Sequence, residues 1–442
     1  MGGEWRVSPV STLIEQGALV VGDGYRAKNE ELSSSGLPFA RAGNINDGFR
    51  FDDADHFPED GLERVGNKVS QPGDVVFTSK GTVGRFAFVR SSTPRFIYSP
   101  QLCFWRSLAP SLIDPRFLFF WMFGREFFVQ FKGVAGQTDM AEYVSLTDQR
   151  RMHITLPPLA EQRAIARILC TLDDKIELNR RMNATLEAMA RALFKSWFVD
   201  FDPVRAKAEG RDPGLPKPLA DLFPTTFVQS EVGSIPAGWS IGPILERAAL
   251  LSGGTPKTDR PEYWGGDILW ASARDVSQCG EAFLVSTERT ITREGVEQSS
   301  TQLVPAFATI VVARGATTGR MALTGREMAM NQTCYALSSR EGTPFALYSS
   351  IRHEIDGLVH AAHGSVFDTI TTSTFAASRV VLPPTAMLTA YEGIAAPLFR
   401  RILAATEEAR VLAVVRDALL PKLLSGELRV WSAEGVALRD AT

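Results

Sequence analysis

The chain has 442 residues, of which 45% are hydrophobic and 22% charged, with a net charge of −3 and a pI of about 6.1. This composition excludes a disordered or fibrous protein, and no apolar run reaches the ~18 residues that a membrane span needs. It argues against a small DNA-binding protein driven by its own positive charge, and the four scattered cysteines favour a reduced, cytoplasmic protein without disulfides or a zinc site.

Residues 1–155 are expected to form a first mixed α/β domain. A strand is predicted at the β-rich run Asp74–Phe77, between turns rich in Gly and Asn, and a helix is predicted from Pro115 to Phe131.

Residues 156–202 are predicted to form a long central spacer helix. Their apolar residues recur in alternating steps of three and four, which is the pattern of a coiled-coil seam, and Asn179 and Asn183 occupy two seam positions. About 40 helical residues span roughly 60 Å at 1.5 Å per residue. Residues 203–224, rich in proline and charge, are expected to be an exposed linker.

Residues 225–385 are predicted to form a second α/β domain, with a strand at Thr309–Val312 and a helix at Pro344–Val359. Residues 386–426 are predicted to form a C-terminal spacer helix that a glycine ends, and residues 427–442 a tail. The expected fold class is therefore α+β.

The two halves of the sequence repeat one another. Leu156–Pro158 recurs as Leu382–Pro384, 226 residues later, and the seam of the second helix has the same 226-residue offset. Within the domains the offset drifts, reaching 234 between Gly81 and Gly315. Helix length is therefore constrained, whereas loops in the domains vary. The repeat predicts a pseudo-twofold molecule whose two helices pack on each other. Two independent core helices would leave the shared register unexplained.

Four segments resemble the specificity (S) subunit of type I restriction-modification systems. The central conserved region of that family is similar to LPPLAEQRAIARILCTLDDKIELNRRMNATLEAMARALFKSWFVDFDPVRAKAEG, and its C-terminal counterpart to ALLPKLLSGELRV. The opening segments of its two target-recognition domains are similar to GLPFARAGNINDG and SGGTPK…YWGGDILWAS. The second copy reads LPPTAMLTAYEGI, which departs from the LPPLAEQ signature.

The resemblance implies two α/β target-recognition domains separated by two long antiparallel coiled-coil helices. Each domain would read one half of a bipartite sequence in double-stranded DNA. The chain itself would be non-catalytic and bind no cofactor. Two methyltransferase subunits would add methyl groups to adenine from S-adenosylmethionine, and motor-nuclease subunits would cut DNA with ATP and Mg.

The sequence contains no catalytic motif that would indicate an enzyme. There is no NPPY-like amino-methyltransferase motif and no GxxxxGK[ST] phosphate loop. The segment Asp173–Lys175 has the DxK spacing of some nucleases, but it lies on the predicted helix, where a solvated face explains it. We therefore expect neither catalytic residues nor a metal site.

The residues predicted to bind DNA flank glycine turns in both domains. Each glycine turn carries cations at a place where the backbone can approach a phosphate: Lys80, Gly81 and Arg85 in the first domain, and Arg314, Gly315 and Arg320 in the second. An arginine can alternatively form a bidentate hydrogen bond with guanine. Further candidates are Gln137, Thr138, Ser365, Arg41, Asn44, Lys257 and Arg274. Each residue could instead belong to an ordinary exposed turn.

Glu161, Gln162 and Arg163 begin the first helix with a face predicted to point outward. The resemblance implies that a methyltransferase subunit docks there, although an acid in the first turn also suits the helix dipole. The sequence is also compatible with two other functions. One is a coiled-coil spacer whose globular ends bind proteins, and the other is a specificity partner of a methyltransferase without a nuclease.

Overall fold

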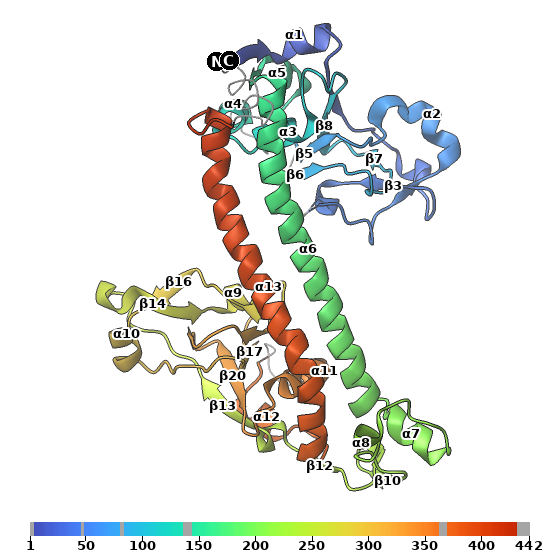
Figure 1. Ribbon diagram of the computed structural model, residues 1–442, viewed down its shortest axis with the longest axis vertical. Coiled ribbons are helices and arrows are strands. Elements are labelled where there is room, and N and C mark those ends of the chain that lie inside the picture. The colour runs from blue at the N-terminus through green and yellow to red at the C-terminus, as the bar shows by residue number, and fades with distance from the viewer. Residues whose placement is uncertain (1–3, 46–47, 80–83, 136–143, 362–368, 431–442) are drawn as a thin grey trace, which may run out of the picture. The chain divides into compact units, whose positions relative to one another are not determined.

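The computed structural model describes residues 4–45, 48–79, 84–135, 144–361 and 369–430, and its chain forms two compact units. The first unit comprises residues 1–175 and 412–442, and the second comprises residues 176–411. Each unit therefore contains one α/β domain and a part of both long helices (Figure 1).

The domain of the first unit is built on three small sheets. The largest has the strand order β2-β8-β5-β6, the second β4-β3-β7, and the third pairs β1 with β9. These strands are β1 (Arg6–Pro9), β2 (Leu19–Asp23), β3 (Leu37–Ala40), β4 (His56–Phe57), β5 (Val75–Thr78), β6 (Phe86–Phe88), β7 (Ile97–Tyr98), β8 (Leu102–Ser107) and β9 (His153–Leu156). Its helices are α1 (Val10–Glu15), α2 (Leu62–Val65), α3 (Pro115–Trp121), α4 (Arg125–Ala135) and α5 (Leu146–Arg151).

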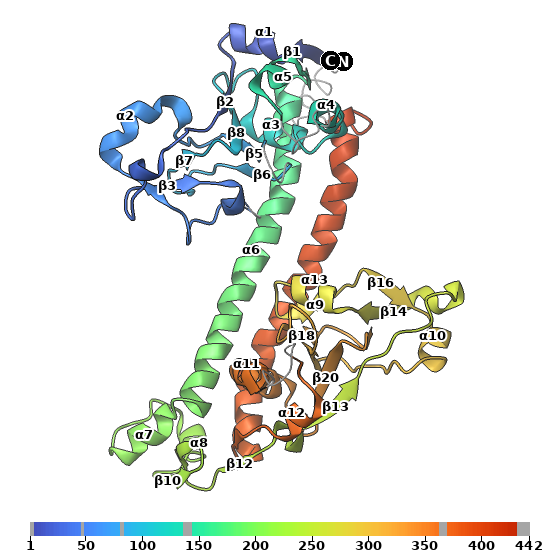
Figure 2. The same ribbon diagram turned by 180° about the vertical axis from the view of Figure 1, so that it is seen from behind.

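Every strand of the first domain has a counterpart in the second unit, which adds one strand, β15, at the edge of its largest sheet. Figure 2 shows the second unit from behind. Three of its sheets have the orders β13-β20-β17-β18-β15, β16-β14-β19 and β12-β21, and a fourth pairs β10 (Phe227–Ser230) with β11 (Gly233–Pro236). The strands are β12 (Ser240–Gly242), β13 (Ala248–Ser252), β14 (Trp264–Ala271), β15 (Phe283–Leu284), β16 (Arg289–Ile291), β17 (Thr309–Val312), β18 (Met321–Thr324), β19 (Ala329–Met330), β20 (Cys334–Ser339) and β21 (Val380–Leu382). The helices are α9 (Ala273–Gln278), α10 (Arg293–Glu297), α11 (Pro344–Ala361) and α12 (Thr372–Ala376).

Strand registers confirm the duplication. In the first unit β3 runs parallel to β7 with Ala40 opposite Tyr98, and in the second β14 runs parallel to β19 with Ala271 opposite Met330. The start of each domain is tied to its end in the same way, because Arg6 pairs with Leu156 and Ser240 with Leu382. The predicted strands at Asp74–Phe77 and Thr309–Val312 are β5 and β17.

The two long helices are α6 (Leu159–Phe198, 40 residues) and α13 (Thr385–Ser425, 41 residues). The predicted seam is confirmed, since Ile165, Leu169, Tyr391, Ile402 and Leu423 and their seam neighbours are all at least half-buried. Gly426, with φ of 75°, ends the second helix as expected.

Within each unit the helices pack antiparallel, because partner numbers fall along α13 as they rise along α6. In the first unit Asp173 of α6 contacts Arg416 of α13, and Glu161, nearer the start of α6, contacts Arg429, just beyond the end of α13. In the second unit Asn183 contacts Thr406, and the Ala190 carbonyl accepts a hydrogen bond from Tyr391.

Two expectations about helices and linkers are wrong. The single helix predicted from Pro115 to Phe131 is two helices, α3 and α4, and Gly124 lies between them. A Cβ atom at Gly124 would lie 2.9 Å from the Leu424 side chain and 3.0 Å from the Trp121 carbonyl oxygen, so this position has no room for a side chain. Residues 203–224 are not simply an exposed linker. They contain α7 (Asp202–Ala208) and α8 (Lys217–Ala220), and Val204 and Phe223 join the apolar cluster at the end of α6.

Candidate nucleic-acid interface

Five of the residues predicted to bind DNA lie outside the described residues. They are Lys80, Gly81, Gln137, Thr138 and Ser365. The structure therefore adds nothing to these five predictions.

In the first domain, the predicted residues Arg41, Asn44 and Arg85 come together around one loop. The Asn44 side-chain oxygen accepts the Arg41 backbone N–H at 2.8 Å, and its amide group donates to the Arg50 carbonyl at 2.9 Å. The Arg41 guanidinium pairs with Asp55 at 2.6 Å, and both side chains are about half-exposed. Asn44 therefore shapes the loop, while Arg41 remains accessible beside a carboxylate.

Arg85 also supports this loop. Its guanidinium donates to the carbonyl oxygens of Ala42 at 3.2 Å and Ile45 at 3.5 Å, although the side chain is exposed. Arginine has five N–H donors, so these two contacts leave donors for a ligand. The sequence did not indicate this bracing role, because the two segments lie 40 residues apart.

The second domain builds the equivalent loop from different residues. Ser272 replaces Arg41, and its backbone N–H is accepted by Asp275, the counterpart of Asn44, at 2.9 Å. Arg274 lies in the first turn of α9, which Ser272 caps, and is 3.4 Å from Glu288, with both side chains about two-thirds exposed. A pair this exposed is worth little energy, so Arg274 stays available to an anion.

Arg314, Gly315 and Arg320 lie on the turn after β17. Gly315 has φ of +102° and Gly319 of +89°, conformations that side chains rarely adopt. Both arginines are exposed, and within the described ranges neither guanidinium has an ion-pair or hydrogen-bond partner. This turn is therefore an exposed basic loop of the kind predicted.

The remaining predicted cation, Lys257, lies next to an aromatic cluster that the sequence did not single out. Its carbonyl oxygen accepts the indole N–H of Trp264 at 3.1 Å, and the rings of Trp264 and Trp270 meet edge to face at 5.2 Å. The guanidinium of Arg289 lies over the Trp264 ring, 3.4 Å from its centroid. The signal for this cluster was the pair of tryptophans in YWGGDILW, but only the strand register brings Arg289 opposite Trp270.

At the start of α6, the expectation of an outward-facing cluster is correct only for Arg163. Glu161 is buried, accepting the Trp5 indole N–H at 3.0 Å and two hydrogen bonds from Arg429 at 2.6 and 2.9 Å. Gln162 is also buried, and its amide binds backbone groups of three other residues. Docking by these two side chains would require their internal contacts to break.

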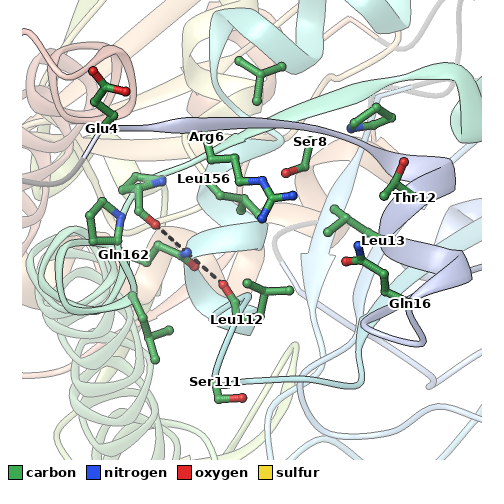
Figure 3. Close-up of a pocket in the computed structure, with 15 residues that line it drawn as sticks. Glu4, Arg6, Ser8, Thr12, Leu13, Gln16, Ser111, Leu112, Leu156 and Gln162 are labelled. Carbon is green, nitrogen blue, oxygen red and sulfur yellow. Dashed lines mark hydrogen bonds between the residues drawn. The ribbon is translucent and has the colours of Figure 1, made fainter.

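A hollow of about 240 Å³ lies between the β1 strand and the start of α6 (Figure 3). Gln162 closes one side of it by donating to the carbonyl oxygens of Leu112 and Pro157, at 3.0 and 2.9 Å. Two large apolar side chains on its lining, Val7 and Leu112, are 59% and 40% exposed.

The second copy lacks the polar cluster around Glu161. The counterparts of Glu161 and Gln162 are Met387 and Leu388, which are buried in an apolar cluster. Trp239, the counterpart of Trp5, has an indole N–H without a partner among the described residues. The departure from the LPPLAEQ signature therefore changes the packing at this end of the second domain.

Comparison with known proteins identifies the family. The sequence profile of the type I restriction modification DNA specificity domain matches residues 17–188 and again residues 236–387. The chain belongs to this family. Both halves of the predicted repeat are thus copies of one specificity domain.

Individual relatives agree with this assignment. The chain is 26% identical to the type I restriction enzyme HindI specificity subunit of Haemophilus influenzae, over 82% of the chain and 88% of that protein. It is 22% identical to the MjaIX specificity subunit of Methanocaldococcus jannaschii, over 84% of the chain and 81% of that protein. The fold matches the S subunit of a type I system from M. genitalium, with a TM-score of 0.59, 14% identity and coverage of 95% and 96%.

No helix within the described ranges combines the length and the apolarity needed to cross a bilayer.

Proposed function

We propose that this chain is the DNA-recognition subunit of a type I restriction-modification complex, with each α/β domain reading one half of a bipartite target. The observation that carries the proposal is the strand-for-strand duplication of a specificity domain, with exposed basic residues on equivalent loops. A protein-binding spacer would not require two copies of this domain.

The basic residues have the character that DNA contacts need. Arg314, Arg320 and Lys257 are exposed, and their charged groups have no partner among the described residues, whereas Arg41 and Arg274 are exposed in weak surface pairs. Such residues bind phosphates or base edges at little cost in desolvation. The overall net charge of −3 favours binding within an assembly whose other subunits add phosphate contacts.

The chain would act with partners that perform the chemistry. We propose that two methyltransferase subunits, using S-adenosylmethionine, dock on the helical region, and that motor-nuclease subunits supply cleavage with ATP and Mg in the cytoplasm. Exposed Arg163 and the apolar lining residues Val7 and Leu112 are the groups near the start of α6 that such a subunit could contact. The chain would bind none of the cofactors itself.

Exchange of the first domain tests the proposal. Residues 1–155 are replaced by the equivalent segment of a related S subunit of different specificity, and methylated motifs are determined by sequencing the host genome. We expect one half of the bipartite motif to change while the other half and the gap are kept. As a control, residues 225–385 are exchanged instead, which should change the opposite half. A motif that changes in both halves, or in neither, would contradict one half-site per domain.

A further inference from the structure

Arg289 is held in a geometry that suits base recognition. Its guanidinium lies 3.4 Å from the centroid of the Trp264 ring and 5.8 Å from that of Trp270. The side chain is exposed, and within the described part of the chain no carboxylate pairs with it. Stacking on an indole fixes the plane of the guanidinium while leaving its N–H edges free.

The tryptophans that form this platform are themselves fixed. The Trp264 indole donates to the Lys257 carbonyl at 3.1 Å, and the Trp270 indole donates to the Gly254 carbonyl at 3.0 Å. The strand pairing of β14 with β16 places Trp270 opposite Arg289, and a register shift between Trp264 and Ile268 accommodates the platform. The guanidinium is therefore ordered before any ligand binds.

The first domain carries an acid at the equivalent position. Phe39 corresponds to Trp270, and Asp55 lies opposite Phe39, where its carbonyl oxygen accepts the Phe39 N–H at 2.7 Å. Asp55 neutralises Arg41 there, whereas Arg289 has no acidic partner among the described residues. The equivalent position therefore carries a negative side chain, Asp55, in the first domain and a positive one, Arg289, in the second. This is the pattern expected of a position at which two copies of a reading module differ in specificity.

We propose that Arg289 reads a guanine in the second half-site, with two guanidinium N–H groups donating hydrogen bonds to the O6 and N7 acceptors of that base in the major groove. The proposal rests on the proposed function and adds a base-reading residue that the sequence did not indicate. An ordered arginine fork matches this pair of acceptors, and such contacts are the commonest specific ones in protein–DNA complexes.

The test uses the full chain assembled with its methyltransferase subunits. Arg289→Ala, Arg289→Lys and, as a control for charge, Arg293→Ala are compared, since Arg293 is also exposed and lies four residues away. Methylome sequencing gives the motif, and binding is measured on duplexes that carry the motif or single-base variants of it. Thermal unfolding checks that each variant is folded.

We expect Arg289→Ala to relax one G·C position of the second half-site, lowering discrimination there by about 5- to 150-fold. Arg289→Lys should not restore discrimination, because an ammonium lacks the planar fork, and Arg293→Ala should leave the motif unchanged. Trp264→Ala should weaken discrimination at the same position.

Two results would overturn the assignment of Arg289. One is an equal loss of affinity on all sequences that lysine restores, which indicates a phosphate contact. The other is an unchanged motif with unchanged affinity. If the unsubstituted complex methylated no bipartite motif at all, the proposed function itself would fall.

Discussion

At the scale of single residues, the two copies differ most clearly where the first long helix begins. Glu161 binds both Trp5 and Arg429, so it fastens the N-terminal strand and the segment after α13 to the start of α6. In the second copy Met387 replaces this acid, and the Trp239 indole N–H is left without a described partner. A buried N–H that lacks an acceptor costs ~1–3 kcal/mol, so the second copy should be the less stable at this point.

Replacement of Glu161 by methionine should therefore destabilise the first unit. The substitution removes the carboxylate that accepts hydrogen bonds from the Trp5 N–H and the partly buried Arg429 guanidinium, and we expect the unfolding free energy to fall by about 3 kcal/mol. Urea denaturation of the full chain, followed by circular dichroism, measures the change. Met387→Leu is the matched control in the second copy and should cost under ~1.5 kcal/mol. Equal stability of Glu161→Met and the unsubstituted chain would show that this cluster contributes nothing.

The sequence predicted the residue types of the candidate interface better than their roles. Arg314 and Arg320 are exposed on a glycine turn as expected. Asn44, predicted to bind DNA, and Gln162, predicted to take part in methyltransferase docking, instead bind backbone groups, since an amide in the sequence looks the same whether its partner is DNA, another subunit or a carbonyl. The Arg289 stack could not be predicted, because it depends on the register between β14 and β16.

At the scale of elements, a polar junction joins the second domain to both long helices. Thr406 of α13 donates to the Glu281 carboxylate at 2.6 Å, and Asn183 of α6 donates to Thr406 at 3.0 Å and lies 3.2 Å from Glu281. Phe283, two residues after Glu281, meets Phe399 of α13 with their ring centroids 6.4 Å apart. Two apolar surfaces can slide past one another at little cost, whereas the half-buried Glu281 carboxylate meets both donors in one position only. The junction should therefore fix where the domain lies along the helices.

Removal of the two donors tests this role. In Asn183→Leu/Thr406→Val the Glu281 carboxylate loses both of these donors in a half-buried site, and we expect a loss of ~1.5–3 kcal/mol in unfolding free energy. Adding Glu281→Leu should recover most of that loss, because an all-apolar junction carries no unpaired charge. Urea unfolding gives the energies, and methylome sequencing of the triple variant shows whether gaps of more than one length are now accepted. A triple variant as unstable as the double would argue against an unpaired carboxylate as the cause.

The long helices and the repeat were the elements best predicted from the sequence. Their seam spacing extends over 40 residues, so the helical signal is strong, and α6 and α13 match the prediction within a few residues. The four-residue strands β5 and β17 were predicted because their buried residues form continuous β-rich runs, whereas strands of two or three residues carry too few side chains to be predicted individually. The break between α3 and α4 was missed because the aromatic run continues through it, while contacts of Gly124 with Leu424 depend on the tertiary fold.

At the scale of the whole molecule, the equal length of the two helices is the feature that the proposed function explains. If the two helices set the gap between the half-sites, both helices must have the same length, and they must pair in a fixed register. Their 40 and 41 residues, with a constant offset of 226 between seam positions, meet that requirement. Offsets within the domains vary, as loops that only present side chains are free to do.

Deletion of one heptad from each helix should shorten the gap in the target. Residues 172–178 and 411–417 are the matched segments, because Asp173 pairs with Arg416 in the first unit. Seven residues span about 10.5 Å, which corresponds to about three base pairs of duplex DNA. Motif sequencing from cells with the shortened chain should show both half-sites unchanged and the gap reduced. Deletion from one helix alone should abolish methylation, and a constant gap after paired deletion would refute the spacing role.

The strand-for-strand equivalence of the two domains has a consequence for how such a protein arises. A half-length chain carrying one domain and one helix could pair with an identical copy through the same antiparallel contact, since that contact is self-complementary. Such a homodimer would recognise an inverted repeat. Fusion of the two genes would free each copy to diverge, as Asp55 and Arg289 have done, and so convert a palindromic target into an asymmetric one.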